Sequence, residues 1–435
     1  MRPVRRGTRP RASPAGPPVE LAIDRLGSGG DGLASLDGQR VAVPFALPGE
    51  RVRARLMRAG DGWVAQEVER LSEGSDRIAA PCQHFGRCGG CTLQHVAGPA
   101  YAEFKRGLVQ SALRRQGIGG LDVASPILCP SATRRRAALA GRRLAGGVVL
   151  GFNTRASHTI LDLAECPVLH PGLVRLIAPL RRLLSEIWLA GEGGDVVLTL
   201  SETGIDVVLG LARLPELAAL ERLSAFAVVE DLARLSWRIG EAPAEPVTLR
   251  RMPVVRPGGI AVDLPPGGFL QATEAGEQAL AGVVLEAAVG ATRALDLFAG
   301  IGTFAFRLAA HATVHAVEGD PNSVAAMAAA GRRAQLVGVT TERRDLAARP
   351  LAGAELDGFD LAVFDPPRVG ARAQAEALAA SRIPIIVAVS CNPASFARDA
   401  GILIAGGYTA ELVQPVDQFV WSAHIELAAV FRRTG

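Results

Sequence analysis

The sequence predicts an α/β protein in which three folded parts follow a short tail. Three observations predict it: short alternating runs broken by Gly and Asp turns near the start, a mixed middle that carries a cysteine cluster, and apolar strands alternating with helical spans after about residue 269. With 435 residues, the chain is about three times the usual domain length of roughly 150. We expect a disordered basic tail at 1–18, a small β-barrel at 19–73, a mixed α+β central domain at 74–265 and an α/β domain at 266–435.

Composition is that of a globular protein. The 49% hydrophobic and 21% charged residues are typical of a chain that buries a substantial core. The longest apolar runs, such as residues 383–389, are far shorter than the roughly 18 residues that span a bilayer, so we expect no membrane protein. The early arginines lead into Pro and Gly, which argues against a secretory signal. We therefore expect a cytoplasmic protein, and we take it to be a monomer.

Positive charge is concentrated at the start of the chain. The first eleven residues contain five arginines and no acid. Because the net charge of the whole chain is +4, the remainder of the chain is close to neutral. Lys105 is the only lysine. The forked donors of arginine suit phosphate, but a GC-rich genome also favours arginine. The charge alone is weak evidence for a nucleic-acid partner.

Residues 19–72 predict a small closed β-barrel. Four short runs alternate between apolar and polar residues: VELAIDRL, RVAVPFAL, RVRARLMR and WVAQEVERL. Turns rich in Gly and Asp separate them at roughly eight- to twelve-residue spacing, which is typical of an OB-like barrel. Such a barrel is too small to enclose a large ligand, so its exposed strands and loops would bind the partner, typically an oligonucleotide.

The rest of the chain changes from mixed segments to a regular alternation. We expect a helix at 100–116 and a hairpin at 196–211, where two apolar runs flank a Gly-containing turn. After a helix at 273–288, the strands ALDLF, VHAVE, FDLAVFD and PIIVAVS alternate with helical spans, and IELAAVFR closes the chain. Strands that are apolar throughout and alternate with helices indicate a parallel sheet covered on both faces.

A glycine-containing turn, DLFAGIGTF at 296–304, follows the first of these strands and opens a helix. Gly300 and Gly302 let the backbone approach a ligand closely, and Glu318 at the end of the next strand is placed to hold both hydroxyls of a ribose. A tight turn that needs glycine for geometry alone is the other interpretation. The third glycine of a dinucleotide fingerprint and the Lys-Ser/Thr pair of a triphosphate loop are missing, so this Rossmann-like turn suits S-adenosylmethionine better than NAD or ATP.

The turn Asp365-Pro366-Pro367-Arg368 ends another strand, at the edge where open α/β sheets bind ligands. Its prolines stiffen the loop, although a purely structural turn would use them in the same way. If the chain is a methyltransferase, Arg368 is informative, because enzymes that methylate an exocyclic amine through a similar loop place an aromatic residue there. A ring carbon is then the expected target.

The segment Ser390-Cys391-Asn392-Pro393 places a thiol at the end of the following strand. A cysteine there is often only a small apolar side chain. On this edge it favours covalent catalysis, since a thiolate that adds to C6 of uracil makes C5 nucleophilic enough to accept a methyl group. A base must then remove the C5 proton; Glu426 is the candidate and His424 the competing base.

The six cysteines are unevenly placed. Those at 82, 88 and 91 lie within ten residues, whereas Cys129, Cys166 and Cys391 stand alone. Six are too few for a disulfide scaffold, and a tight cluster without an export signal indicates a metal or cluster site in a reducing compartment. Spacing alone does not separate an iron–sulfur cluster from tetrahedral zinc.

Together these motifs resemble those of the RNA 5-methyluridine methyltransferases, from about residue 19 to 435. The motifs stand in order: C-x5-CGGCTLQH at 82–95, GFN at 151–153, SH at 157–158, CPVL at 166–169, FLQ at 269–271, and the segments 296–304, 365–368, 390–393 and 424–426. The N-terminal barrel looks like a TRAM domain. The resemblance departs at Gln271-Ala272-Thr273, because the family usually has Gln-Val-Asn there, which puts one contact near the cofactor or base in doubt.

The resemblance implies a class I methyltransferase domain in which Cys391 is the nucleophile and Glu426 the base. The S-adenosylmethionine site and its border with the uracil would be lined by Gln271, Asp296, Phe298, Gly300, Gly302, Thr303, Glu318 and Asp365. A [4Fe-4S] cluster, with zinc as the lesser alternative, would be held by Cys82, Cys88, Cys91 and Cys166. Its role would be structural, because methyl transfer from a sulfonium moves no net electrons. Cys129 is expected to be a buried thiol and is the alternative fourth ligand.

The expected function is S-adenosylmethionine-dependent formation of 5-methyluridine in RNA, on a uridine flipped out of its stack. The TRAM-like barrel and the cysteine cluster favour 23S rRNA, because the tRNA branch of the family typically lacks both. The alternatives are a tRNA 5-methyluridine methyltransferase, an RNA cytosine-C5 methyltransferase and a non-catalytic RNA-binding assembly factor. The cytosine enzymes carry cysteines in Pro-Cys and Thr-Cys contexts, which the Asp-Pro-Pro loop lacks.

Overall fold

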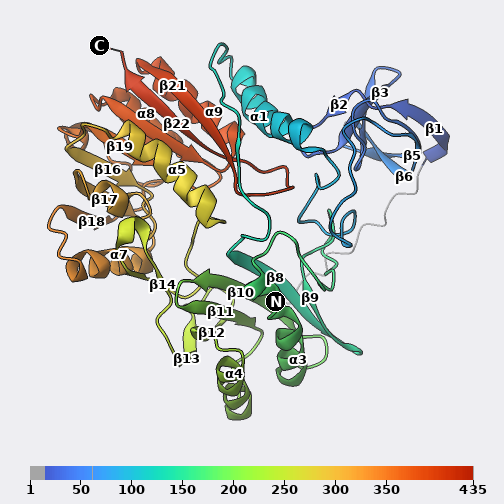
Figure 1. Cartoon of the computed structure of the whole chain (residues 1–435), viewed down its shortest axis with the longest axis horizontal. Helices are drawn as coiled ribbons and strands as arrows, with labels where there is room; N and C mark the ends of the chain where they lie inside the picture. The colour runs from blue at the N-terminus through green and yellow to red at the C-terminus, as the bar shows by residue number, and fades with distance from the viewer. Residues whose placement is uncertain (1–14, 61, 435) are drawn as a thin grey trace, which may run out of the picture. The chain divides into compact units, whose positions relative to one another are not determined.

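The computed structural model describes residues 15–60 and 62–434, which form two compact units (Figure 1). The smaller unit comprises 15–60, 62–86, 91–104 and 421–423, and the larger one 87–90, 105–420 and 424–434. Most of the tail expected at 1–18 lies outside the described residues, and its last four residues belong to the first strand. None of the described helices is long and apolar enough to cross a membrane.

A six-stranded sheet forms most of the smaller unit. Its strands are β1 (Ala15–Ala22), β2 (Arg25–Leu26), β3 (Gly32–Leu36), β4 (Gln39–Val43), β5 (Arg51–Ala59) and β6 (Gly62–Ser72). They lie in the order β1-β5-β6-β4-β3-β2, and β1 also packs against β3, so the sheet curls around a core that includes Leu21, Val41 and Val52. The four expected strand regions are confirmed and β3 is an additional strand, while the closed OB-like barrel stays a prediction.

The smaller unit continues beyond the boundary expected at residue 73. Leu93 and Tyr101 pack with Leu47 in a second small core. The carbonyl of Trp421 accepts hydrogen bonds from the backbone N–H groups of Thr92 and Leu93 at 2.8 and 3.0 Å. Apolar and backbone contacts therefore attach parts of the expected central and C-terminal domains to this unit, and local strand patterns do not reveal such contacts.

The central part of the chain forms its own six-stranded sheet within the larger unit. Its strands are β8 (Arg136–Leu144), β9 (Gly147–Gly151), β10 (Gly193–Ser201), β11 (Gly204–Leu211), β12 (Arg234–Ile239) and β13 (Glu245–Leu249). The order is β13-β12-β11-β10-β8-β9, and the antiparallel pair β10–β11 confirms the expected hairpin. The helices are α2 (Pro171–Val174), α3 (Ile177–Ile187) and α4 (Leu217–Val229). Of these, α3 packs against β9 and α4 against β12 and β13.

An eight-stranded sheet forms the C-terminal part of the larger unit, in the order β18-β17-β16-β19-β20-β22-β21-β7. Its strands are β7 (Ile127–Leu128), β16 (Arg293–Leu297), β17 (Thr313–Glu318), β18 (Val339–Arg343), β19 (Leu361–Phe364), β20 (Ile385–Ser390), β21 (Tyr408–Asp417) and β22 (Glu426–Arg433). A separate short pair, β14 (Val254–Val255) and β15 (Val262–Asp263), precedes β16 and flanks the 3-10 turn η1 (Pro257–Gly259).

The expectation of a parallel sheet fails at one strand, β22, since β21 and β7 also pair in parallel. β18, β17, β16, β19 and β20 are parallel neighbours, whereas β22 runs antiparallel to both β20 and β21. The connection from β21 to β22 is too short for the crossover that a parallel pair needs. Neither β18 nor β21 is among the strands predicted from the sequence, and the reversal of β22 is not predicted either.

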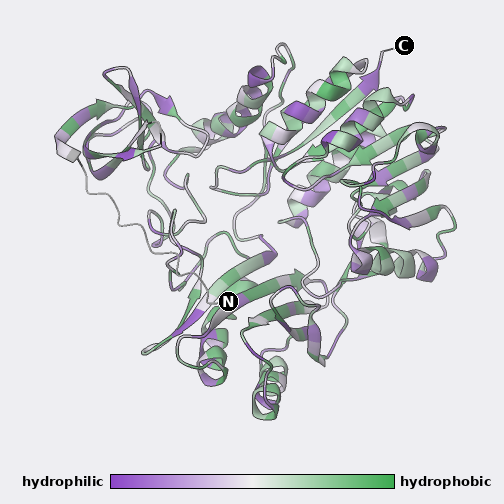
Figure 2. Cartoon of the chain, turned by 180° about the vertical axis from the view of Figure 1, so that it is seen from behind, coloured by the Kyte–Doolittle hydropathy of each residue, from purple (hydrophilic) through white to green (hydrophobic). Residues whose placement is uncertain are grey.

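Helices cover both faces of the C-terminal sheet. They are α1 (Gly98–Arg115), α5 (Glu274–Ala287), α6 (Ala305–Leu308), α7 (Pro321–Arg333), α8 (Arg372–Ala380) and α9 (Pro393–Ala405), with the 3-10 turn η2 (Gly353–Leu356). One core joins side chains of α5, α6 and α7 to the strands, and a second joins side chains of α1, α8 and α9 to alternate strand residues. The strands between these two cores are mostly hydrophobic, as Figure 2 shows. The helices expected at 100–116 and 273–288 are confirmed as α1 and α5.

Candidate active site

A cavity of about 810 Å³ opens at the carboxyl ends of β16, β17, β19 and β20. Eight of the expected site residues line it: Gln271, Phe298, Gly300, Thr303, Glu318, Asp365, Cys391 and Glu426. Parallel strands place their carboxyl ends at one edge, which explains how segments far apart in the sequence meet here. The candidate nucleophile, the candidate base and the glycine turn therefore share one cavity.

The glycine turn bends sharply after β16. Phe298, Gly300 and Gly302 have φ values of 62°, 57° and 92°, a region that glycine adopts without strain and that Phe298 adopts at a cost. A Cβ atom on Gly302 would lie 2.6 Å from the ring of Phe306. Gly302 is therefore needed for packing beneath the turn and does not line the cavity, whereas Gly300 does.

Asp296 lies beneath the turn and not in the cavity wall. Its side chain is 0% exposed, and its Oδ2 accepts a hydrogen bond from the N–H of Ala305 at 2.7 Å. Its Oδ1 has no hydrogen-bond partner among the described residues. Burial raises the pKa of this carboxyl from 3.8 to about 8, with smaller contributions from Asp365 and Glu318. The neutral acid thus supports the start of α6 from behind.

Glu318 lies at the end of β17 and lines the cavity. Its Oε2 accepts a hydrogen bond from the N–H of Gly300 at 2.9 Å, and its Oε1 accepts one from the N–H of Asp320 at 2.8 Å. These two bonds fix the carboxylate against the glycine turn. Each oxygen retains a lone pair, so the group suits the paired hydroxyls of a ribose.

The Asp-Pro-Pro turn and the cysteine turn are joined to each other. The Nδ2 of Asn392 donates to the carbonyl of Arg368 at 3.0 Å, and the hydroxyl of Ser395 donates to the same carbonyl at 3.1 Å. The Oδ1 of Asn392 also accepts from the N–H of Ala394, which caps α9. Asp365 and Cys391 are therefore held on two rigidly connected turns.

The thiol of Cys391 is half-buried and lies near two carboxyl groups. Burial, followed by the charges of Glu426 and Asp365, raises its pKa from 9.0 to about 11, while Arg368 acts in the opposite direction. Burial likewise raises the pKa of Asp365 to about 7. The thiol is therefore neutral at physiological pH until a proton acceptor or a bound substrate changes its surroundings.

Glu426 reaches the cysteine because β22 is antiparallel to β20. Ser390 pairs with Leu427 in the ladder, so the first residue of β22 lies beside the residue that follows β20. Glu426 is 3% exposed, and burial raises its pKa well above 4.5, with Asp365 contributing further. His424 does not line the cavity, and burial lowers its pKa, followed by the effect of Arg368.

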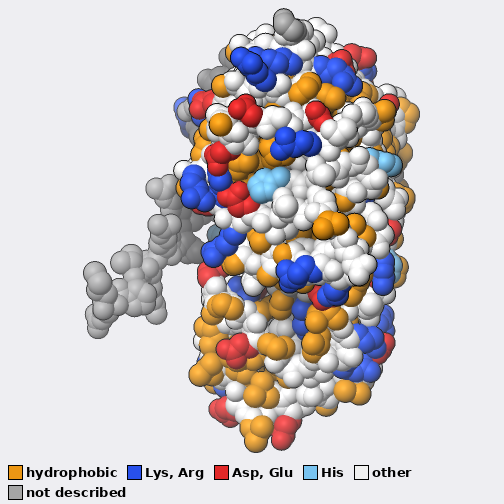
Figure 3. All heavy atoms as spheres, turned by 90° about the vertical axis from the view of Figure 1, so that its left-hand side faces the viewer, with side chains coloured by type: hydrophobic (Ala, Val, Ile, Leu, Met, Phe, Trp, Pro, Cys, Tyr) orange, Lys and Arg blue, Asp and Glu red, His pale blue; other side chains and the backbone are white. Residues whose placement is uncertain are grey.

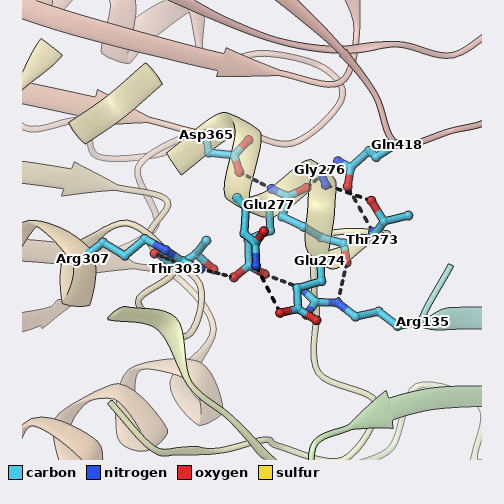
Figure 4. Close-up of polar contacts among 11 residues, drawn as sticks. Arg135, Thr273, Glu274, Gly276, Glu277, Thr303, Arg307, Asp365 and Gln418 are labelled. Carbon is cyan, nitrogen blue, oxygen red and sulfur yellow. Dashed lines mark hydrogen bonds and ion pairs between the residues drawn. The ribbon is translucent and has the colours of Figure 1, made fainter. Parts of the chain in front are cut away.

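Thr273, the departure from the family pattern, caps a helix. Its Oγ1 accepts a hydrogen bond from the N–H of Gly276 at 3.0 Å at the start of α5, and the residue is 1% exposed (Figure 4). The backbone N–H of Thr273 donates to Oε1 of Gln418 at 3.4 Å. Threonine thus performs an ordinary N-cap function at this position.

Several cavity residues were not expected from the sequence, among them Arg134, Arg136, Asp345, Gln418 and Phe419. Gln418 follows β21, a strand that the sequence did not suggest, and the two arginines belong to the central part of the chain. The guanidinium of Arg136 lies 5.9 Å from the centre of the Phe269 ring. Arg134 lies two positions before β8 and Arg136 is its first residue, and neither position indicates in the sequence that the side chain lines a distant cavity.

An ion-pair triad beside the cavity joins three separate segments (Figure 4). Glu277 of α5 pairs with Arg135, and its other oxygen accepts from Nη2 of Arg307 at 2.7 Å. Arg307 also donates to the carbonyl of Thr303 at 2.5 Å, and Arg135 donates to the carbonyl of Gln271 at 3.1 Å. The triad therefore links the central part of the chain to the glycine turn.

The cysteines expected to hold a cluster are divided between the two units. Cys82 and Cys91 belong to the smaller unit, and Cys88 and Cys166 to the larger one. Within the larger unit, the N–H of Gly90 donates to the sulfur of Cys88 at 3.4 Å, a contact that suits a thiolate ligand. No group of three or more His, Cys, Asp or Glu side chains among the described residues is arranged to hold a metal ion. Cys129 is buried in a hydrophobic core, as expected.

Similar proteins cover nearly the whole chain. An RNA methyltransferase of Rhizobium meliloti is 41% identical over 421 residues, which is 95% of this chain and 99% of the relative. The 23S rRNA (uracil(1939)-C(5))-methyltransferase RlmD of Chromohalobacter salexigens is 37% identical over 432 residues, covering 95% and 89%. No protein-family model matches the sequence.

A solved structure has the same fold. The Pyrococcus abyssi tRNA (uracil-54, C5)-methyltransferase in complex with S-adenosyl-L-homocysteine superimposes with a TM-score of 0.73. It covers 95% of this chain and 100% of its own, at 22% identity.

Replacing Asp296 with asparagine tests the buried acid. A carboxyl whose pKa is raised on folding stabilises the fold below its unfolded value of 3.8, and this contribution is lost as the pH rises through about 8. Asp296→Asn keeps an acceptor for Ala305 without a charge, so the variant should be more stable than the wild type at pH 9 and similar at pH 4. Thermal unfolding at both pH values measures this; equal melting temperatures at pH 9 would contradict the assignment.

Proposed function

The chain belongs to the RNA uracil-C5 methyltransferases, S-adenosylmethionine-dependent enzymes, and on this premise we propose that it forms 5-methyluridine in 23S rRNA by covalent catalysis in the cavity described above. The observation that carries the proposal is the register of β20 and β22, which brings Cys391 and Glu426 to the same edge of the sheet. We further propose that the enzyme acts in the cytoplasm as a monomer.

In the proposed reaction, the thiol of Cys391 gives its proton to water as the uridine binds, and the sulfur then bonds to C6 of uracil, which leaves an enolate across C5, C4 and O4. Bound S-adenosylmethionine supplies an electrophilic methyl group. C5 takes that methyl, and the donor sulfur leaves as a neutral thioether. The carboxylate of Glu426 then accepts the C5 proton, the C6–S bond breaks, and the ring double bond is restored.

The cavity residues suit this division of roles. Glu318 and the glycine turn would bind the donor's ribose, and Gln271 and Asp365 would lie between donor and base. The pKa of Cys391, raised to about 11 by burial and by the nearby carboxyl groups, means that the thiol must be deprotonated as the substrate binds. Burial raises the pKa of Glu426, which is appropriate for a group that must accept a proton from carbon.

The choice of 23S rRNA is supported by the Chromohalobacter relative, a 23S rRNA (uracil(1939)-C(5))-methyltransferase, and by the N-terminal sheet and cysteine loop of this chain. We propose that the N-terminal sheet is a TRAM-like barrel that binds the RNA on either side of the target uridine. Figure 3 shows one face of the molecule on which basic and acidic side chains are interspersed, unlike the continuous basic stripe that follows a phosphate backbone. We expect RNA to bind at the cavity rim, where Arg134 and Arg136 lie.

We also propose that Cys82, Cys88, Cys91 and Cys166 hold a [4Fe-4S] cluster. Four thiolates are the donor set that such a cluster uses, and the Gly90 N–H to Cys88 sulfur bond is consistent with it. Since methyl transfer moves no net electrons, its role would be to join the segments that carry the cysteines.

Variants of the nucleophile and base should separate the steps of the reaction. Cys391→Ala should abolish both methylation and the covalent RNA adduct, because no sulfur can add to C6. Glu426→Gln should accumulate a methylated protein–RNA adduct, because proton removal at C5 is blocked while addition is not. Denaturing gels and mass spectrometry of the adduct measure this, with Cys129→Ala as a matched control that should retain wild-type turnover. Normal product release by Glu426→Gln would remove Glu426 from the mechanism.

The RNA class is tested by deleting the gene. We expect 5-methyluridine to fall in 23S rRNA and to remain unchanged in tRNA, and purified enzyme should restore it on an rRNA fragment. Nucleoside mass spectrometry of both RNA pools measures the change. A loss confined to tRNA would support the tRNA alternative, a methyl group on cytosine would support the cytosine alternative, and no lost methyl would support an assembly factor.

The cluster is tested by metal analysis of anaerobically purified protein. We expect about four iron atoms per chain with visible absorbance, lost in Cys88→Ser and in Cys166→Ser and retained in Cys129→Ser. One zinc per chain in place of iron would overturn the assignment of the cluster. Iron retained in Cys166→Ser and lost in Cys129→Ser would show Cys129 to be the fourth ligand.

A further inference from the structure

Two glutamine side chains connect the carboxyl groups of the cavity. The Nε2 of Gln418 donates to Oε2 of Glu426 at 2.9 Å and to Oε1 of Gln271 at 2.6 Å. The Nε2 of Gln271 in turn donates to Oδ2 of Asp365 at 3.0 Å. Gln418 is 1% exposed and lines the cavity. A continuous chain of hydrogen bonds therefore runs from Glu426 to Asp365.

A backbone group fixes the orientation of this chain. The N–H of Thr273 can only donate, and it donates to Oε1 of Gln418 at 3.4 Å (Figure 4). Both Nε2 hydrogens of Gln418 must then point to the other two partners. Gln271 consequently accepts through its oxygen and donates through its nitrogen, so neither amide can flip without placing an oxygen against an oxygen.

Gln418 packs directly against the start of α5, so its side chain has no room to move toward that helix. A Cβ atom added to Gly276 would lie 2.7 Å from Cβ of Gln418 and 3.1 Å from its Oε1. Glycine at this position lets the helix start approach the end of β21 closely enough for the Thr273 contact. The amide chain thus depends on a close approach of α5 that any larger residue would prevent.

We propose that Gln418 is a positioning residue for the methylation reaction, which holds the carboxylate of Glu426 and the amide of Gln271 in fixed orientations for removal of the C5 proton. The proposal rests on the proposed role of Glu426. Among the described residues, Gln418 is the only hydrogen-bond donor to the Glu426 side chain. Burial raises the pKa of Glu426, and the hydrogen bond from Gln418 lowers it by stabilising the carboxylate. Gln418 therefore helps to keep Glu426 ionised, as a base must be.

The first test replaces Gln418 with leucine, which has a similar size but no polar group. We expect kcat to fall at least tenfold, while KM for RNA and the affinity for S-adenosylmethionine change less than about threefold. Covalent RNA adduct should accumulate. The acidic limb of the pH profile of kcat should move upward by roughly one unit, because a lost donor raises the pKa of Glu426. Gln414→Leu, the same change on β21 and outside the cavity lining, is the matched control.

The second test leaves Gln418 in place and displaces it. Gly276→Ala adds a methyl group that overlaps Gln418, whereas Gly282→Ala adds one on the same helix where no atom lies within 4 Å. The added methyl of Gly276→Ala would also lie 2.9 Å from Oγ1 of Thr273, so thermal unfolding of both variants is measured alongside turnover to separate a loss of stability from a displaced Gln418. We expect Gly276→Ala to reproduce the lower kcat and shifted pH limb of Gln418→Leu, and Gly282→Ala to match the wild type.

The outcomes distinguish this inference from the proposal on which it rests. If Glu426→Gln traps the adduct but Gln418→Leu and Gly276→Ala turn over with the wild-type kcat and pH profile, Gln418 has no positioning role and the inference fails. If Glu426→Gln releases product normally, the role of Glu426 itself is wrong. If Gln418→Leu raises KM alone, or lowers kcat without moving the pH limb, the residue acts only through packing, which also overturns the inference.

Discussion

Burial of two carboxyl groups beside a thiol is the constraint on which the catalytic centre depends. Asp365 and Glu426 both have pKa values raised by burial, and their charges in turn raise the pKa of Cys391. The ionised forms of these three groups repel one another, so hydrogen-bond donors are needed to stabilise the carboxylates in one cavity. Gln418 and Gln271 are those donors, and the rigid turns at Arg368 and Asn392 keep the thiol in place.

The reversal of one strand determines which residues can react together. In a sheet that was parallel throughout, the start of the last strand would lie at the edge opposite the end of β20. Because β22 is antiparallel, Leu427 pairs with Ser390, and Glu426 joins Cys391 at the ligand-binding edge. The same reversal pairs Glu426 with Val416 of β21, which brings Gln418 within hydrogen-bond distance of the carboxylate.

The family membership and the local structure complement each other. Relatives at 41% and 37% identity establish the family, while the geometry explains how this chain tolerates a departure from the family's usual motif. Thr273 caps α5 with its hydroxyl and orients Gln418 with its backbone N–H. The backbone contact is independent of the side chain, so the capping role is the only one that threonine itself must fulfil.

The sequence alone determined the elements whose signals are local: the glycine turn after β16, the Asp-Pro-Pro turn, the cysteine turn and the apolar strands that precede them. Parallel strands bring their carboxyl ends together, so these residues could be assigned to one site before the fold was known. Only the tertiary structure decided that Asp296 and Gly302 lie behind the cavity wall, that Arg134 and Gln418 line it, and that the cysteines divide between two units. Those outcomes depend on strand direction, close packing and contacts between distant segments, which no local pattern encodes.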